Sequence, residues 1–198
     1  MELHDPYRAP ATFPTPPALP RALPETRPHA QPISDAAAYY SPSSMKMVTL
    51  SLTTLGLYPV YWFWRNWQAI KRETGGTQWP WARALFSPLW AYLCFSQLRD
   101  AASNRRRDLA FAPGLLALAY FLLNLASRLP NAGWLLALFA FVPLLPVNSL
   151  VRRYHQDERV DMAQMDRFSA LHILVTVVGG LFLLLLFIVM AMNPEVSR

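Results

Sequence analysis

Two long stretches of this chain carry almost no charge, and this feature limits what the chain can fold into more than any other. Between Leu109 and Val151 the only charged side chain is Arg128, and between Phe168 and Pro194 there is none. A soluble fold of 198 residues leaves most of its surface in water, so it cannot hide this much apolar side chain. The sequence therefore predicts a multi-pass integral membrane protein.

Five runs are free of charge, and their lengths predict how many of them cross a bilayer. They cover residues 47–64, 84–98, 109–127, 129–151 and 168–194. A spanning helix needs about 20 apolar residues, and the last three runs are long enough, with a tight turn at Pro130–Asn131 joining two of them. We predict an all-α fold, a transmembrane helical bundle with three firm spans in a membrane domain of residues 45–194.

Glycine and proline interrupt the first two runs. Gly56 is typical of the residue that follows a helix, and Pro59 of a helix start, so we expect a short helix ending near Leu55 and a second one beginning at Pro59. Pro88 lies within the second run, which is either a kinked span or a re-entrant element. The prolines of FVPLLPV predict a similar kink in the fourth run.

The distribution of cations distinguishes between the ways in which these runs can be threaded, because Lys and Arg favour the cytoplasmic side. If all five runs cross, the flanking cations divide nine against six. If the first two runs both return to the side they came from, the division is thirteen against two. If only the second run returns, four runs cross and the cations divide twelve against three, but the N-terminal tail must then be moved across the membrane. We predict a cytoplasmic N-terminus, with the first two runs re-entrant or interfacial.

Residues 1–44 are predicted to form a disordered, proline-rich tail. Ten of the chain's 18 prolines fall within residues 1–42. Such a segment buries too little apolar surface to offset the entropy lost on ordering. It also contains no apolar core of a signal peptide, so we expect the N-terminus to be retained.

An aromatic and basic segment follows Gly56 and supplies the candidate binding residues. These are Tyr58, Tyr61, Trp62, Trp64, Arg65, Asn66 and Trp67. Trp and Tyr concentrate at the level of the lipid headgroups, so the simplest interpretation is an interfacial anchor. In the more specific hypothesis, Arg65 and Asn66 join the rings to bind a lipid headgroup or a protein partner. An arginine offers a phosphate two parallel hydrogen bonds and offers aromatic rings a cation–π contact.

The same segment, LGLYPVYWFWRNWQAIK, resembles bacterial membrane proteins grouped as domain of unknown function 4234. Later features follow a similar order: WARALFSPLW, then VPLLPVN, and a final apolar helix with two adjacent glycines. The resemblance extends over residues 47–192, which is almost everything except the tail. It implies a multi-pass protein of the bacterial cytoplasmic (inner) membrane, and it supplies no catalytic residues.

Polar side chains within the apolar runs are few and none is acidic. They are Asn124, Ser127, Asn148, His172 and Thr176. The missing carboxylate argues against a proton-coupled transporter. We expect the two asparagines to hold helices together by hydrogen bonds, and the glycine pair Gly179 and Gly180 to mark a close helix contact.

The remaining motifs predict no metal, cofactor or nucleic-acid site. Cys94 is the only cysteine, which excludes a disulfide and a cysteine-based metal site. His155 and Glu158 have a spacing that can bind metal, but they lie in a mixed-charge segment that is usually solvated. The basic residues, among them NRRR at 104–107, flank apolar runs and therefore indicate topology rather than nucleic-acid binding.

These observations leave two classes of function. The first is a non-enzymatic membrane component that binds lipid, a protein partner or a second copy of itself through its aromatic and basic cytoplasmic surface. The alternative is a small transporter or channel, either as a single chain or as an oligomer. An enzyme ranks third, because the sequence offers no recognisable pair of nucleophile and base and no set of metal ligands.

Overall fold

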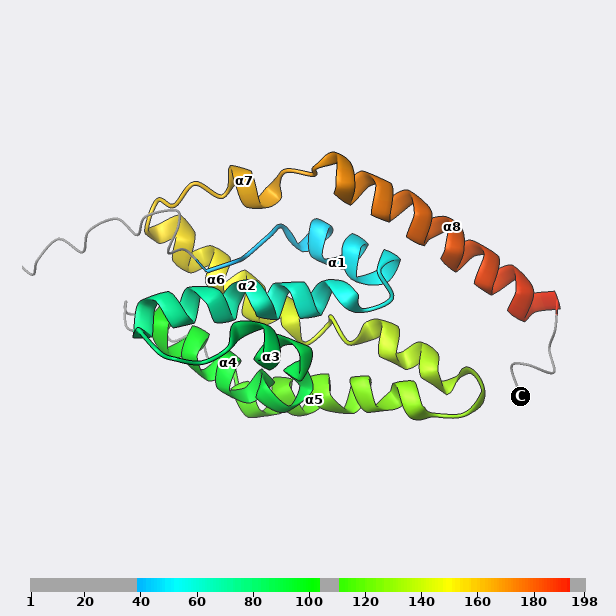
Figure 1. Cartoon of the computed structure of the whole chain (residues 1–198), viewed down its shortest axis with the longest axis horizontal. Coiled ribbons are helices and arrows are strands. Elements are labelled where there is room, and N and C mark those ends of the chain that lie inside the picture. The colour runs from blue at the N-terminus through cyan, green and yellow to red at the C-terminus, as the bar shows by residue number, and fades with distance from the viewer. Residues whose placement is uncertain (1–38, 104–110, 193–198) are drawn as a thin grey trace, which may run out of the picture. The chain divides into compact units, whose positions relative to one another are not determined.

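The computed structural model describes residues 39–103 and 111–192, and every regular element within these ranges is helical. The elements are α1 (Ser44–Thr53), α2 (Leu57–Thr74), α3 (Pro80–Leu85), α4 (Ser87–Ser103), α5 (Pro113–Leu125), the 3₁₀ helices η1 (Ala126–Arg128) and η2 (Asn131–Phe139), α6 (Leu144–Asp157), α7 (Ala163–Asp166) and α8 (Ala170–Met192) (Figure 1). The all-α prediction is therefore confirmed. Residues 1–38 of the predicted tail and the NRRR segment lie outside the described residues.

The breaks expected from glycine and proline are present. Helix α1 ends at Thr53, and Gly56 has a φ of 87°, a left-handed conformation that glycine adopts without strain. Helix α2 then begins at Leu57, two residues before the predicted start. The second run breaks at Phe86, between α3 and α4, and leaves Pro88 in the first turn of α4, where a proline is tolerated.

The fourth run also bends where its prolines predict. Its first part forms η2, a 3₁₀ helix of nine residues, which is long for this kind of helix. The chain leaves η2 at Ala140 and begins α6 at Leu144, directly after Pro143. A proline at this junction starts a new helix more readily than it continues an old one.

Two helical stretches are long and apolar enough to cross a membrane. They are Gly133–Asp157 and Ala163–Met192. The third expected span, residues 109–127, contains α5, which has 13 residues and is shorter than the roughly 20 that a span needs. Two of the three predicted spans therefore have a matching helix in the part of the chain that the structure describes.

Aromatic rings from several helices form the core. Phe63 of α2 lies 5.7 Å from Phe95 of α4 and 5.2 Å from Tyr120 of α5, measured between ring centroids. Trp62 and Leu144 are also completely buried in this cluster. The core thus joins α2, α4, α5 and α6.

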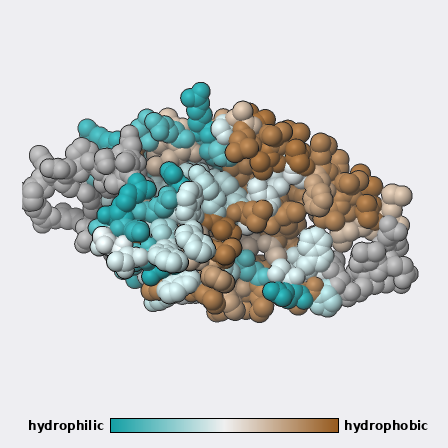
Figure 2. Space-filling model, in the orientation of Figure 1, coloured by the Kyte–Doolittle hydropathy of each residue, from teal (hydrophilic) through white to brown (hydrophobic). Residues whose placement is uncertain are grey.

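Helix α8 differs from these helices because none of its described side chains is buried. Figure 2 shows hydrophobic side chains gathered over it. It packs on α1, where a Cβ atom at Gly179 would overlap the carbonyl oxygen of Thr53, whereas a Cβ at Gly180 would meet nothing within 4 Å. The predicted close contact is therefore confirmed for Gly179 and is wrong for Gly180.

Candidate functional site

The seven candidate residues all lie on α2, but they do not share one surface. Four of them point into the core: Tyr58, Trp62, Asn66 and Trp67, with at most 6% of each side chain exposed. Tyr61 and Arg65 are exposed and Trp64 is half-buried. The hypothesis that all seven form one surface that binds a lipid headgroup is therefore wrong for the four buried residues. The 3.6-residue period of the helix turns their side chains toward the core.

The buried aromatic side chains have structural partners. The Trp62 Nε1 atom donates a hydrogen bond to Asn148 Oδ1 at 3.1 Å. The guanidinium of Arg83 lies between two indoles, 4.5 Å from the ring centroid of Trp67 and 4.7 Å from that of Trp90. Such cation–π contacts explain how an arginine is accommodated next to an aromatic core.

Asn66 holds a segment that we call the strap, residues 39–43. Its side-chain oxygen accepts the backbone N–H of Tyr40, and its Nδ2 donates to the carbonyl oxygens of Tyr40 and Trp62, at 3.0–3.1 Å. The Nδ2 atom of Asn148 donates to the Pro42 carbonyl at 2.7 Å. The bonds to Tyr40 and Pro42 satisfy backbone groups of the strap, which has no helix or sheet partner of its own. Residues 39–44, which were predicted to belong to the disordered tail, are therefore held in place by these contacts and by the start of α1.

The two asparagines predicted to join helices differ in what they do. Asn148 links α6 both to α2, through Trp62, and to the strap, so this prediction is confirmed. The Nδ2 atom of Asn124 donates to the Tyr120 carbonyl one turn earlier in the same helix. Its hydrogen bond therefore does not join two helices.

The other side of the strap faces α6. The Ser41 hydroxyl lies 2.8 Å from His155 Nδ1, and Arg152 Nη1 donates to the Ser41 carbonyl at 2.9 Å. Arg152 also forms a two-pronged ion pair with Asp166, at 2.7 and 2.8 Å. Ser41 and His155 are completely buried. His155 is thus a structural partner of the strap on α6, and not part of a solvated loop beside Glu158.

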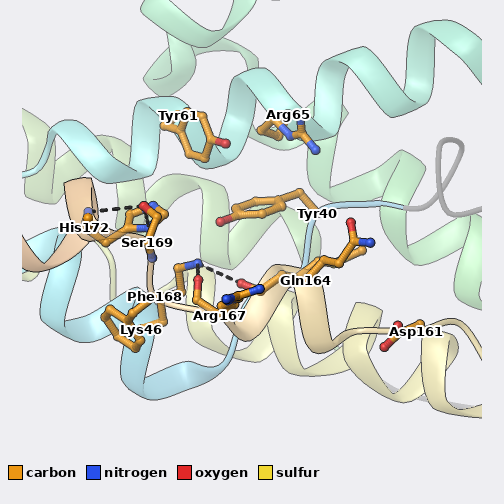
Figure 3. Close-up of a pocket in the computed structure, with 12 residues that line it drawn as sticks. Tyr40, Lys46, Tyr61, Arg65, Asp161, Gln164, Arg167, Phe168, Ser169 and His172 are labelled. Atoms are coloured by element: carbon orange, nitrogen blue, oxygen red, sulfur yellow. Dashed lines mark hydrogen bonds between the residues drawn. The ribbon is translucent and has the colours of Figure 1, made fainter.

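A cavity of about 520 Å³ opens between the strap, α1, α2 and the segment that leads into α8 (Figure 3). It is lined by Tyr40, Lys46, Tyr61, Arg65, Asp161, Gln164, Met165, Arg167, Phe168, Ser169, Ala170 and His172. We call it the headgroup-level cavity, because it lies beside the first turn of the apolar helix α8. Two of the seven candidate residues, Tyr61 and Arg65, belong to it.

The charge of this cavity is positive. Lys46, Arg65 and Arg167 line it, against one acidic residue, Asp161. The Arg65 guanidinium lies 5.6 Å from the ring centroid of Tyr40. Within the described ranges, neither Arg65 nor Arg167 has a carboxylate at ion-pair distance. The guanidinium groups of Arg65 and Arg167 are therefore available to bind an anion in the cavity.

The tyrosine pair beneath Arg65 stays neutral. The Tyr40 and Tyr58 hydroxyls lie 2.9 Å apart. Burial raises the pKa of Tyr40 to about 12, although the hydrogen bond from Tyr58 acts in the opposite direction. Burial also raises the pKa of Tyr58. No tyrosinate is therefore present at neutral pH to cancel the charge of Arg65.

Lys46 forms the floor of the cavity. Its side chain is 2% exposed, and its Nζ donates to the carbonyl oxygens of Met165 and Arg167, both at 2.9 Å. Burial lowers the pKa of Lys46, and the Asp166 carboxylate opposes this shift. The lysine thereby ties α1 to the corner between α7 and α8.

Ser169 and His172 complete the start of α8. The Ser169 backbone N–H donates to His172 Nδ1 at 3.1 Å, and the His172 backbone N–H donates to the Ser169 hydroxyl at 3.4 Å. This reciprocal pattern is that of a capping box, with histidine in the place of the usual Glu or Gln. The pair of serine and histidine thus caps a helix.

Sequence reasoning missed the strap and three lining residues, Tyr40, Lys46 and Arg167. The two cations carried a usable signal, since Lys46 directly precedes the first apolar run and Arg167 directly precedes the last. A cation at the start of each of two apolar runs would predict that the two lie close together if the runs begin on the same side, and Lys46 does contact the Arg167 carbonyl.

Comparisons with protein-family models, with curated proteins and with solved structures give no match. The resemblance of the aromatic segment to domain of unknown function 4234 stays a prediction.

Proposed function

We propose that this chain is a multi-pass integral membrane protein that binds anionic phospholipid headgroups in the headgroup-level cavity and catalyses no reaction. One observation carries the proposal: Arg65 and Arg167, without carboxylate partners in the described structure, line a cavity beside the first turn of an uncovered apolar helix.

Helix α8 supports insertion into a bilayer. Its 23 residues extend about 35 Å, which exceeds the roughly 30 Å of a hydrocarbon core. Large apolar side chains are exposed along its whole length, from Leu171 (67%) through Leu181 (62%) to Met192 (75%). Soluble proteins rarely expose an apolar patch of this extent. A helix that is apolar all round is one that lipid surrounds.

The packing of α1 against α8 supports re-entry of the first apolar run. Lys46 contacts the Arg167 carbonyl before α8 begins, and Thr53 contacts Gly179 further along, so the two helices run in the same direction. From Ala170 to Gly179 the rise is about 14 Å, half of a hydrocarbon core of about 30 Å. There the chain turns at residues 54–56 and returns as α2. This favours a cytoplasmic side that holds both the strap and the end of α6.

The depth of Arg65 follows from the same geometry. Eight residues separate it from Leu57, which corresponds to about 12 Å along the returning helix. Arg65 is therefore near the level at which α8 begins, at the boundary between hydrocarbon and headgroups, from which its long side chain extends toward the phosphates of the cytoplasmic leaflet. Two guanidinium forks and the Tyr61 hydroxyl match the acceptor oxygens of a phosphate.

Two pairs of serine and histidine were not visible in the sequence, and both favour a non-enzymatic role. Ser41 and His155 are sealed from substrate by burial. Ser169 and His172 use their polar atoms to cap α8. The exposed Ser169 hydroxyl lies 2.7 Å from His172 Nδ1, but no third group in the described part of the chain orients the imidazole as a base.

The test uses the full-length chain, purified in a neutral detergent, with bound lipids counted by native mass spectrometry. We expect phosphatidylglycerol to bind more tightly than phosphatidylcholine with the same acyl chains. Arg65→Ala and Arg167→Ala should each weaken phosphatidylglycerol binding about fivefold, since one basic residue near an anionic surface contributes about 1 kcal/mol. Arg153→Ala is the matched control, because Arg153 is exposed on α6 and outside the cavity. Equal loss in the control variant would contradict the proposal.

The topology is tested separately by cysteine labelling of the chain in membranes. We expect labels at positions 20 and 158 to react from the cytoplasmic side and a label at position 198 from the opposite side. Labelling of positions 20 and 158 from opposite sides would rule out the re-entrant arrangement.

A further inference from the structure

An apolar groove lies between α2 and α3, on a different part of α2 from the strap. It has a volume of about 430 Å³ and is lined by Leu57, Val60, Tyr61, Trp64, Trp81, Ala84 and Leu85. A second, polar cavity of about 500 Å³ adjoins it and is lined by Trp64, Gln68, Lys71, Arg72, Pro80 and Trp81. Trp64 and Trp81 line both spaces, so the two adjoin at these rings, and we treat them as one groove with an apolar end and a basic end.

The periodicity of α2 produces this change of character. Leu57, Tyr61, Trp64, Gln68 and Arg72 follow one another at intervals of three or four residues and therefore form a single stripe along the helix. The first half of the stripe is apolar and aromatic, and the second half is polar and cationic. Helix α3 supplies the opposite wall through Trp81 and Leu85.

The basic end of the groove has no acidic lining residue within the described structure. Arg72 uses its Nε to donate to the Gln68 carbonyl at 3.2 Å, which leaves its terminal nitrogens for another acceptor. Glu73, the nearest acid along the helix, accepts a hydrogen bond from Tyr39 and lines a different cavity. Lys71 and Arg72 therefore present two positive charges to whatever occupies this end.

We infer that the groove binds one anionic phospholipid, with an acyl chain between Leu57 and Trp81 and the phosphate at Lys71 and Arg72. The order of polarity argues for this occupant, because the apolar end lies toward the bilayer centre and the basic end toward the surface. The length agrees: the 15-residue rise from Leu57 to Arg72 is about 22 Å, and half of a bilayer of about 40–45 Å is similar. The orientation rests on the proposed membrane placement of α2.

This lipid site is separate from the headgroup-level cavity. The two spaces share only Tyr61, and the cations of one do not line the other. The cations of the headgroup-level cavity are Lys46, Arg65 and Arg167, and those of the α2–α3 groove are Lys71 and Arg72. The groove would hold one acyl chain at its apolar end and the phosphate at its basic end.

The experiment measures tryptophan fluorescence of the full-length chain in phosphatidylcholine bilayers that contain a brominated lipid. Bromine on an acyl chain quenches an indole only at close range, so Trp64 and Trp81 report on the groove. We expect brominated phosphatidylglycerol to quench more than brominated phosphatidylcholine at the same mole fraction. The Lys71→Ala/Arg72→Ala double variant should remove this excess, with a loss of preference of about fivefold for each cation. Trp81→Phe should diminish the excess, and Trp134→Phe, a change on η2 outside the groove, should leave it intact.

Equal quenching by the two brominated lipids would overturn the inference, and so would an excess that survives the loss of Lys71 and Arg72. The Arg65→Ala/Arg167→Ala variant separates this site from the first one. Excess quenching that persists in that variant supports an independent groove. Loss of the excess in that variant would mean that the groove is not an independent site. Flotation of each variant with the vesicles tests membrane placement on its own.

Discussion

Helices α2 and α8 are both rich in large apolar side chains, yet they are held in opposite ways. On α2 the largest side chains, Trp62 and Trp67, are completely buried in protein. On α8 no described side chain is buried, and Gly179 packs against the backbone of Thr53 in α1. The aromatic helix α2 is therefore a core element, and the aliphatic helix α8 is the one that protein leaves uncovered.

The difference follows from what each side chain can bond to. Indole and amide groups on α2 carry donors and acceptors, and Trp62 and Asn66 find partners for them in α6 and the strap. Leu, Val and Ile on α8 carry no polar atoms, so hydrocarbon satisfies them fully. Two helices in a bilayer gain little from hydrophobic attraction, so their association depends on close packing at small residues that let the backbones approach.

Removing the strap should have the largest effect, because the inner face of α2 depends on it. Deletion of residues 2–43 removes the rings of Tyr39 and Tyr40, both at least 93% buried, and each buried ring contributes about 3–5 kcal/mol. We expect no cooperative thermal unfolding transition from the purified protein in detergent. Deletion of residues 2–36 spares the strap and should leave the melting temperature unchanged. A normal transition after the longer deletion would show that α2 does not need the strap.

Trp67→Ala comes next and tests whether α2 is a core helix. The substitution removes a completely buried indole and one partner of Arg83, so we expect a loss of about 3–5 kcal/mol in the free energy of unfolding. Trp79→Ala is the matched control, since Trp79 is 66% exposed and surface changes usually stay within about 0.5 kcal/mol. Chemical denaturation in mixed micelles measures both. Similar losses for the two variants would remove the distinction between core and surface tryptophans.

The sequence was sufficient for the class of fold and for the position of most breaks. Charge-free runs and the residues Gly56, Pro88 and Pro143 act locally, so their effects can be read without knowing what packs where. The helix break at Gly56 needs only a left-handed φ, which glycine supplies. The predicted span over residues 109–127 was longer than α5, because an apolar composition does not determine where a helix ends.

The candidate site was predicted only in part, because burial is a property of the assembled chain. Tyr61 and Arg65 remain in it, while Trp62, Asn66 and Trp67 are removed from it by partners that lie far away in sequence. Asn66 bonds Tyr40, 26 residues earlier, and Trp62 bonds a residue 86 positions later. Composition shows that a segment is aromatic, and only the packing decides which rings face outward.

The smallest of these effects concerns α8 and compares two adjacent glycines. Gly179→Ala introduces a methyl group that overlaps the Thr53 carbonyl, so α1 and α8 must separate. Overpacking of this kind costs about 1–3 kcal/mol. Gly180→Ala meets no atom within 4 Å and should be neutral or slightly stabilising, because alanine is the better helix former by about 1 kcal/mol.

The effects of Gly179→Ala and Gly180→Ala are measured as the melting temperature of each variant in detergent and as the amount of each variant inserted into membranes. We expect insertion to be unchanged in both, since α1 leaves most of α8 uncovered and the apolar character of α8 does not change. A lower melting temperature for Gly179→Ala alone would establish that α8 is held to the protein at one small-residue contact. Equal melting temperatures would mean that α1 and α8 do not touch at Gly179. The direction assigned to α1, and with it the depth of Arg65, would then lose its support.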